Sequence, residues 1–110
     1  MSKKALNAAI ALAKLSKCRH KHGAVLMKKG QVIATGTNIR LNGFPVNDSD
    51  WRLSNLHAEE MAISIAGTNA SGATLYVARV NAHGVPRLSL PCDRCRGKIY
   101  RAKIRRVVST

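Results

Sequence analysis

Three potential metal ligands lie in two distant segments of the chain, and they constrain the fold more than any other feature. One segment is His57-Ala58-Glu59, and the other is Pro91-Cys92-Asp93-Arg94-Cys95. Zinc prefers cysteine thiolates and neutral imidazoles as ligands. Two cysteines three residues apart share one face of the first turn of a helix, where the free N–H groups favour thiolates. We therefore expect the starts of two helices to meet at one zinc ion.

Glu59 follows the potential histidine ligand by two residues. Three protein ligands leave a fourth tetrahedral position for water, as in catalytic zinc sites. Zinc lowers the pKa of that water towards about 7, and a nearby carboxylate can take the proton and deliver it to a leaving group. Residues two apart on a regular helix point about 200° apart. His57 and Glu59 can therefore serve one metal only if His57 lies in the irregular opening turn of its helix.

A closed, structural zinc site is the alternative interpretation of the same ligands. The side chains available as a fourth ligand are Cys18, His20, His22 and His83. That interpretation leaves Glu59 without a role, in a chain whose only other glutamate is Glu60. We interpret Cys18 as a small, half-buried apolar residue. His20 and His22 fit a solvated basic patch, and Glu60 fits a surface or helix-start charge.

Hydropathy patterns along the chain predict the element order α-β-β-α-β-α-β. The expected helices cover residues 5 to about 18, 56–66 and 91–103, and the expected strands cover 24–27, 32–35, 73–80 and 107–108. Gly30 fits a hairpin turn between the first two strands, and Gly67 fits the end of the second helix. The strand 73–80 is apolar nearly throughout, which is typical of a sheet covered on both faces. Residues 1–110 are thus expected to form a single α/β domain, a mixed sheet flanked by helices.

At the two ligand segments the sequence resembles the zinc-dependent cytidine/deoxycytidylate deaminase superfamily, whose signature pairs H-x-E with P-C-x-x-C. The resemblance covers nearly the whole chain. Residues 23–26 and 33–38 look like the family's first hairpin, 57–63 like its metal helix, and 75–77 and 104–108 like its third and fourth strands. The resemblance implies the cytidine-deaminase-like three-layer fold. Relative to that fold the sequence stops just after the fourth strand, and an exposed sheet edge invites pairing. We therefore expect a homodimer or a larger homo-oligomer.

The resemblance also implies roles for individual residues. His57, Cys92 and Cys95 would hold one zinc ion per chain, and Glu59 would carry protons from the zinc-bound water to the base. Cytosine would be converted to uracil with release of ammonia. Ala58 would offer its backbone N–H to the base, and Asn38 matches a position that commonly hydrogen-bonds the substrate. Asn38 is equally consistent with a turn residue.

Two aromatic residues, Phe44 and Trp51, lie in the long irregular segment 39–55. Aromatic side chains can stack on a nucleobase, a contact that contributes about 1–3 kcal/mol per base. The alternative is that they pin this segment to the body of the protein. A segment of this length inside a compact domain is usually functional or disordered, and its aromatic content argues against disorder.

The chain is strongly basic, with a formal net charge of +14. Seven cations follow Asp93 without an intervening acid: Arg94, Arg96, Lys98, Arg101, Lys103, Arg105 and Arg106. Such an excess is typical of nucleic-acid binding, and a paired base must first leave the stack to react. We therefore expect the substrate to be cytosine in single-stranded nucleic acid. The alternatives are free dCMP, CMP or cytidine, adenosine in tRNA, and a non-catalytic nucleic-acid-binding module stabilised by zinc.

The amino-terminal segment and the cysteines bear on localisation. An apolar run over residues 5–13 follows Lys3 and Lys4, and we interpret it as an amphipathic helix capped by Ser2 and not as a signal peptide. No apolar run approaches the ~20 residues that a membrane span needs. Three cysteines, two of them three residues apart, make a poor disulfide framework. We expect a cytoplasmic protein without a membrane partner.

Overall fold

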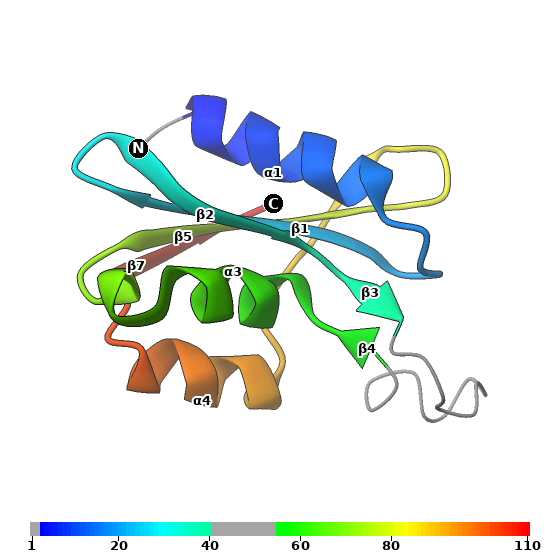
Figure 1. Cartoon of the computed structure of the whole chain (residues 1–110). Coiled ribbons are helices and arrows are strands. Elements are labelled where there is room, and N and C mark those ends of the chain that lie inside the picture. Colours follow the sequence, from blue (N-terminus) through cyan, green and yellow to red (C-terminus); the bar gives the residue numbers. More distant parts are fainter. Residues whose placement is uncertain (1–2, 41–54) are drawn as a thin grey trace.

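The computed structural model describes residues 3–40 and 55–110, in which a mixed sheet lies between two layers of helices (Figure 1). Helix α1 (Lys3–Leu15) covers one face, and α3 (Ala58–Ala66) and α4 (Asp93–Arg101) cover the other. The five strands of the main sheet are β1 (Lys21–Lys28), β2 (Gln31–Thr37), β5 (Thr74–Val80), β6 (Pro86–Arg87) and β7 (Arg106–Ser109). The smaller elements are β3 (Ile39–Arg40), which pairs with β4 (Asn55–Leu56), and the 3₁₀ helix η1 (Gly67–Ala70). The predicted three-layer α/β fold is confirmed.

Strand β5 is the centre of the sheet. It runs antiparallel to β1 on one side, and on its other side it pairs antiparallel with β6 and parallel with β7. Successive residues of a strand point to opposite faces. Leu75 and Val77 accordingly belong to the core under α3 and α4, whereas Tyr76 and Ala78 belong to the core under α1. The nearly continuous apolar run that predicted this strand is explained, because helices cover both faces.

Glycines let two helices pack directly on strand backbone. A Cβ on Gly23 of β1 would lie 2.1 Å from the carbonyl oxygen of Ala9 in α1, and a Cβ on Gly36 of β2 would lie 2.4 Å from that of Ala58 in α3. Real Cβ atoms do not approach backbone oxygens so closely. The contact at Gly36 therefore fixes the first turn of α3 against the sheet, and this turn follows His57.

Two helix ends and one short strand are among the features that differ from the sequence-based predictions. Helix α1 ends at Leu15 and not near residue 18, because the Ser16 hydroxyl turns to the side chain of Asn38, 2.6 Å away. Helix α4 ends at Arg101, and the chain reverses at Lys103, whose φ is 59°. The connection after β5 contains the unpredicted strand β6, which has only two residues.

Other local predictions are confirmed or lie outside the described residues. The β1–β2 turn has positive φ at Lys29 and Gly30, and Gly67 ends α3 with a φ of 58°. Ser2, the expected cap of the first helix, lies outside the described residues. None of the helices in the described ranges is long and apolar enough to span a bilayer.

Candidate metal centre and adjoining cleft

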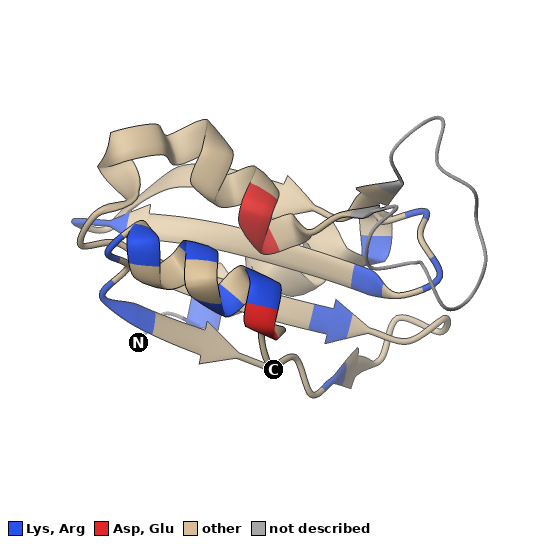
Figure 2. Cartoon of the chain, turned by 90° about the horizontal axis from the view of Figure 1, so that it is seen from below, with Lys and Arg blue, Asp and Glu red and all other residues tan. Residues whose placement is uncertain are grey.

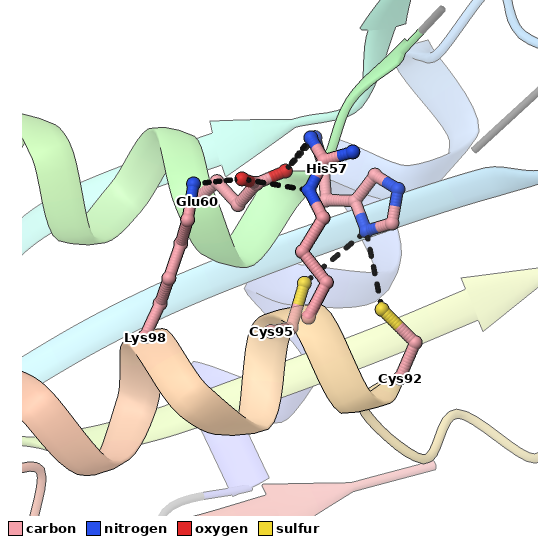
Figure 3. A network of polar contacts seen from close by, with 6 residues as sticks. His57, Glu60, Cys92, Cys95 and Lys98 are labelled. Carbon is pink, nitrogen blue, oxygen red and sulfur yellow. Dashed lines mark hydrogen bonds and ion pairs between the residues drawn. The ribbon is translucent and has the colours of Figure 1, made fainter. Parts of the chain in front are cut away.

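The three predicted zinc ligands meet between the amino-terminal ends of α3 and α4 (Figure 3). The Nδ1 atom of His57 lies 3.1 Å from Sγ of Cys95 and 3.6 Å from Sγ of Cys92. All three ligand atoms lie within 4.8 Å of one another. Tetrahedral zinc with nitrogen at about 2.0 Å and sulfur at about 2.3 Å separates its ligands by about 3.5–3.8 Å. The donor set and its spacing therefore fit one zinc ion.

Two of the ligands occupy equivalent positions, each immediately before a helix. His57 is the N-cap of α3 with φ −76° and ψ 151°, and Cys92 is the N-cap of α4 with φ −73° and ψ 169°. Both residues have extended backbone, so the prediction that His57 lies in the irregular opening of its helix is confirmed. The positive dipole ends of both helices therefore lie at the ligand cluster, which favours thiolates.

The third ligand, Cys95, is fully buried in the first turn of α4. Burial raises the pKa of its thiol far above the ordinary value, and the neighbouring Glu59 carboxylate acts in the same direction. The thiol therefore keeps its proton at neutral pH in the absence of a cation. Since zinc binds the thiolate, metal binding at this site must release that proton.

Glu60 ties the two ligand-bearing helices together. Its carboxylate accepts the backbone N–H of His57 at 3.1 Å, Nη2 of Arg94 at 2.5 Å, and the ammonium group of Lys98 (Figure 3). Burial alone would raise the pKa of Glu60, but the hydrogen bonds from Arg94 and Lys98 lower it to about 2. The prediction of a helix-start charge is confirmed, whereas the prediction of a surface position is wrong, because the residue is buried.

A cleft of about 250 Å³ opens beside the ligand cluster. The cleft is lined by residues that mostly carry polar or ionisable side chains: His20, His22, Asn38, His57, Glu59, Arg79, Leu88, Ser89, Leu90 and Cys92. Glu59 is only 5% exposed, and burial raises its pKa, although hydrogen bonds from its own N–H and from the Cys95 thiol act in the opposite direction. A carboxyl group of raised pKa beside a metal site is suited to accepting and returning a proton.

Of the predicted substrate contacts, Asn38, Ala58, Phe44 and Trp51, the structure describes Asn38 and Ala58. Asn38 lines the cleft, and its Oδ1 already accepts hydrogen bonds from Ser16 Oγ at 2.6 Å and from the N–H of His22 at 2.9 Å. Its amide group donates to the carbonyl of His20. Asn38 therefore has a structural task whether or not it also meets a ligand. Ala58 is fully buried in the first turn of α3. The aromatic pair of segment 39–55, Phe44 and Trp51, lies outside the described residues.

The side chains considered as a fourth ligand do not join the metal cluster, which among the described residues consists of His57, Cys92 and Cys95. The Cys18 thiol donates instead to the carbonyl of Asn38, 3.4 Å away, and His83 is exposed in the turn after β5. The prediction of a solvated side chain is wrong for His22, which is desolvated by burial. His20 also lines the cleft and is partly exposed. Burial, followed by the charge of Arg79, lowers the pKa of His22 to about 4.

Two cleft residues, Arg79 and Ser89, were not predicted from the sequence. A usable signal exists for Arg79. It shares the period-two positions of Leu75 and Val77, so it points to the same face of the sheet as they do, beyond the end of the apolar core. No comparable pattern distinguishes Ser89, which lies in the irregular connection between β6 and α4.

Comparisons with known proteins agree with this geometry. The model of the cytidine and deoxycytidylate deaminase zinc-binding region matches residues 1–110. A dCMP deaminase from the cyanophage S-TIM5 is 25% identical with a TM-score of 0.67, and the match covers 99% of this chain and 84% of that one. A cytidine deaminase from Mycobacterium tuberculosis is 25% identical with a TM-score of 0.62, over 97% and 81% of the two chains.

A third similar structure is RibD from Acinetobacter baumannii, which is 26% identical with a TM-score of 0.62. The match covers 97% of this chain and 27% of RibD, so it concerns only part of that protein. A comparison with curated proteins finds no match.

Proposed function

Since the chain belongs to the cytidine and deoxycytidylate deaminase family and is a zinc-dependent hydrolytic deaminase, we propose that it converts cytosine to uracil in a free nucleoside or nucleotide. The observation that carries this proposal is the position of Glu59. Its carboxyl group is buried, lines the cleft and adjoins the three zinc ligands. A structural zinc site has no need of such a neighbour.

The residues of the cleft have two separate roles in the proposed reaction, metal binding and proton transfer. His57, Cys92 and Cys95 would hold the zinc ion, which when bound supplies a water of lowered pKa at the open end of the site. Glu59 would take one proton from this water and deliver it to the ring nitrogen of the base, and would then carry the second proton, from the hydroxyl group added to the base, to the departing amine. The reaction balances as cytosine plus water giving uracil plus ammonia. The raised pKa of Glu59 favours its return of the proton.

Two observations favour a small substrate over a polynucleotide. Arg94 and Lys98, two of the seven cations that suggested nucleic-acid binding, pair with the buried carboxylate of Glu60. The similar solved structures named above include a dCMP deaminase and a cytidine deaminase. We therefore favour free cytosine nucleosides and nucleotides as substrates over single-stranded nucleic acid, which the net charge alone would favour.

The test is an ammonia-release assay of the zinc-loaded protein with cytidine, deoxycytidine, CMP, dCMP and a single-stranded oligonucleotide containing one cytosine. We expect turnover of at least one of the four small compounds and loss of that turnover after chelation of zinc. Adenosine serves as the control for choice of base. Turnover of adenosine alone, or no turnover of any compound by the zinc-loaded protein, would contradict the proposal.

Single-stranded nucleic acid is the second candidate substrate, and the exposed cations of α4 are the observation that favours it. Figure 2 shows Lys and Arg spaced along this helix, whose single acidic residue, Asp93, lies in its first turn. Arg96 and Arg101 are exposed there. If a strand lies along α4, its affinity should fall steeply with salt because phosphate contacts release counterions. Salt-insensitive binding, or turnover of dCMP without turnover of the oligonucleotide, would remove this candidate.

A further inference from the structure

A row of basic side chains crosses the sheet at the open end of the cleft. In the pairing of β1 with β5, His22 lies opposite Arg79, and in the pairing of β5 with β6, Arg79 lies opposite Arg87. Residues directly opposite in antiparallel strands point to the same face, with Cβ atoms about 4.5–5.5 Å apart. His22 and Arg79 both line the cleft that contains Glu59. The row therefore extends from the cleft to the exposed strand β6.

Like charges directly opposite each other destabilise a sheet. Arg79 and Arg87 have this arrangement, and no acidic side chain is recorded beside either within residues 3–40 and 55–110. The described acids are engaged elsewhere: Glu60 pairs with Arg94 and Lys98, Asp93 pairs with Arg96, and Glu59 lies beside Cys95. Thr110 anchors the backbone of both arginines: its Oγ1 accepts the N–H of Arg79 and donates to the carbonyl of Arg87.

A half-buried guanidinium in a cleft is costly to leave without a partner, and an anion between two arginines would remove their repulsion. Arginine binds phosphate with two parallel hydrogen bonds, which lysine cannot do. The cleft joins Arg79 to the ligand cluster, so an anion at Arg79 can belong to the molecule whose base lies beside Glu59.

We propose that Arg79 and Arg87 bind the phosphate of the nucleotide that carries the cytosine, so that the enzyme acts on nucleotides in preference to nucleosides. This inference rests on the proposed deaminase function and adds its substrate class. The phosphate can come from a free mononucleotide or from a nucleic-acid strand, and both present the same charged oxygens to the arginines.

The experiment compares kcat/KM for dCMP and deoxycytidine in the wild type and in the Arg79→Gln and Arg87→Gln variants. The wild type should prefer dCMP. Because a hydrogen bond to a charged group contributes about 1.5–3 kcal/mol, Arg79→Gln should lower kcat/KM for dCMP about 10- to 100-fold, mainly through KM, and lower kcat/KM for deoxycytidine much less. Arg79→Lys should restore part of the loss. Arg87→Gln, at an exposed position, should give a smaller loss of the same kind.

Arg106→Gln is the matched control, because it removes the same charge from an exposed position of the same sheet. Arg106 pairs with Thr74, five residues along β5 from Arg79 and therefore about 17 Å away. It should leave kcat/KM for both compounds unchanged. A cytosine-containing oligonucleotide separates the two sources of phosphate. Preference for dCMP identifies a mononucleotide, and preference for the oligonucleotide, with the same sensitivity to Arg79→Gln, identifies a strand.

Failure of the phosphate site is distinguishable from failure of the deaminase function. Equal kcat/KM for dCMP and deoxycytidine, unaffected by either arginine variant, would overturn the phosphate site and leave the deaminase function intact. If no cytosine compound is turned over, calorimetric titration of the zinc-loaded protein with dCMP and deoxycytidine still decides the phosphate site. Tighter binding of dCMP that is lost in Arg79→Gln would support it, and equal or absent binding of the two compounds would overturn it.

Discussion

Replacing Glu60 by glutamine tests whether this residue holds the two ligand-bearing helices together. Glu60 accepts hydrogen bonds from His57, Arg94 and Lys98, and its pKa falls from an ordinary value of 4.5 to about 2. A shift of that size corresponds to about 3 kcal/mol at neutral pH. The side chains of Arg94 and Lys98 remain 35% and 42% exposed, so water compensates part of the loss. We therefore expect Glu60→Gln to lower the free energy of unfolding by about 2–3 kcal/mol.

The assay is urea unfolding of both proteins at a fixed zinc concentration and several pH values. A carboxylate of lowered pKa stabilises the fold above its ordinary pKa, and this contribution is lost as the pH falls towards the folded-state value. The difference between wild type and Glu60→Gln should thus be full at pH 7 and shrink as the pH falls from 4.5 towards about 2. Asp93→Asn is the control, since its pair with Arg96 spans 3.7 Å at the surface. Equal stability of wild type and Glu60→Gln at pH 7 would refute the reasoning.

Three further predictions concern packing, pH and metal binding. In thermal melts, Gly36→Ala should destabilise the protein by about 1–3 kcal/mol, because its Cβ would meet the carbonyl of Ala58. The control Gly97→Ala lies within α4, and its Cβ would meet the flexible end of the Arg101 side chain, so it should stabilise the protein by about 0.5–1 kcal/mol. His22, whose pKa is lowered from 6.5 to about 4, should make the wild type lose stability as the pH falls between those values, and His22→Asn should remove that slope; an unchanged slope would contradict the burial argument. Zinc titration at pH 7 in two buffers of different ionisation enthalpy should show proton release that decreases in Cys95→Ser, and equal release in both proteins would contradict the protonated thiol.

The larger elements of the fold follow from local patterns in the sequence. The run 73–80 is apolar on both faces, and such a strand requires a covering layer on each side. The β1–β2 turn and the end of α3 are also local features, because each depends on positive φ at one or two residues within it. Strand β6 could not be predicted in this way, because its two residues are held by pairing with β5 and carry no periodicity. The end of α1 depends on Asn38, a partner 22 residues away.

The metal cluster was predictable from the sequence, whereas the rest of the cleft was only partly so. His57, Cys92 and Cys95 are recognisable because zinc chemistry restricts both residue type and spacing. The roles of Glu60 and His22 depend on what surrounds them. Glu60 is charged and buried because α4 brings two cations to it, and His22 is neutral because the sheet places it in the cleft. Net charge alone does not identify the substrate for a related reason, since a composition does not reveal which cations pair with buried acids, as Arg94 and Lys98 do with Glu60.

The proton-carrying role of Glu59 is tested most directly by measuring zinc content and ammonia release together in Glu59→Gln. The substitution keeps the size of the side chain and leaves His57, Cys92 and Cys95 in place. We expect one zinc ion per chain, as in the wild type, and a loss of turnover of about 10²–10⁴-fold. Wild-type turnover in a variant that retains its zinc would contradict the proton-carrying role of Glu59.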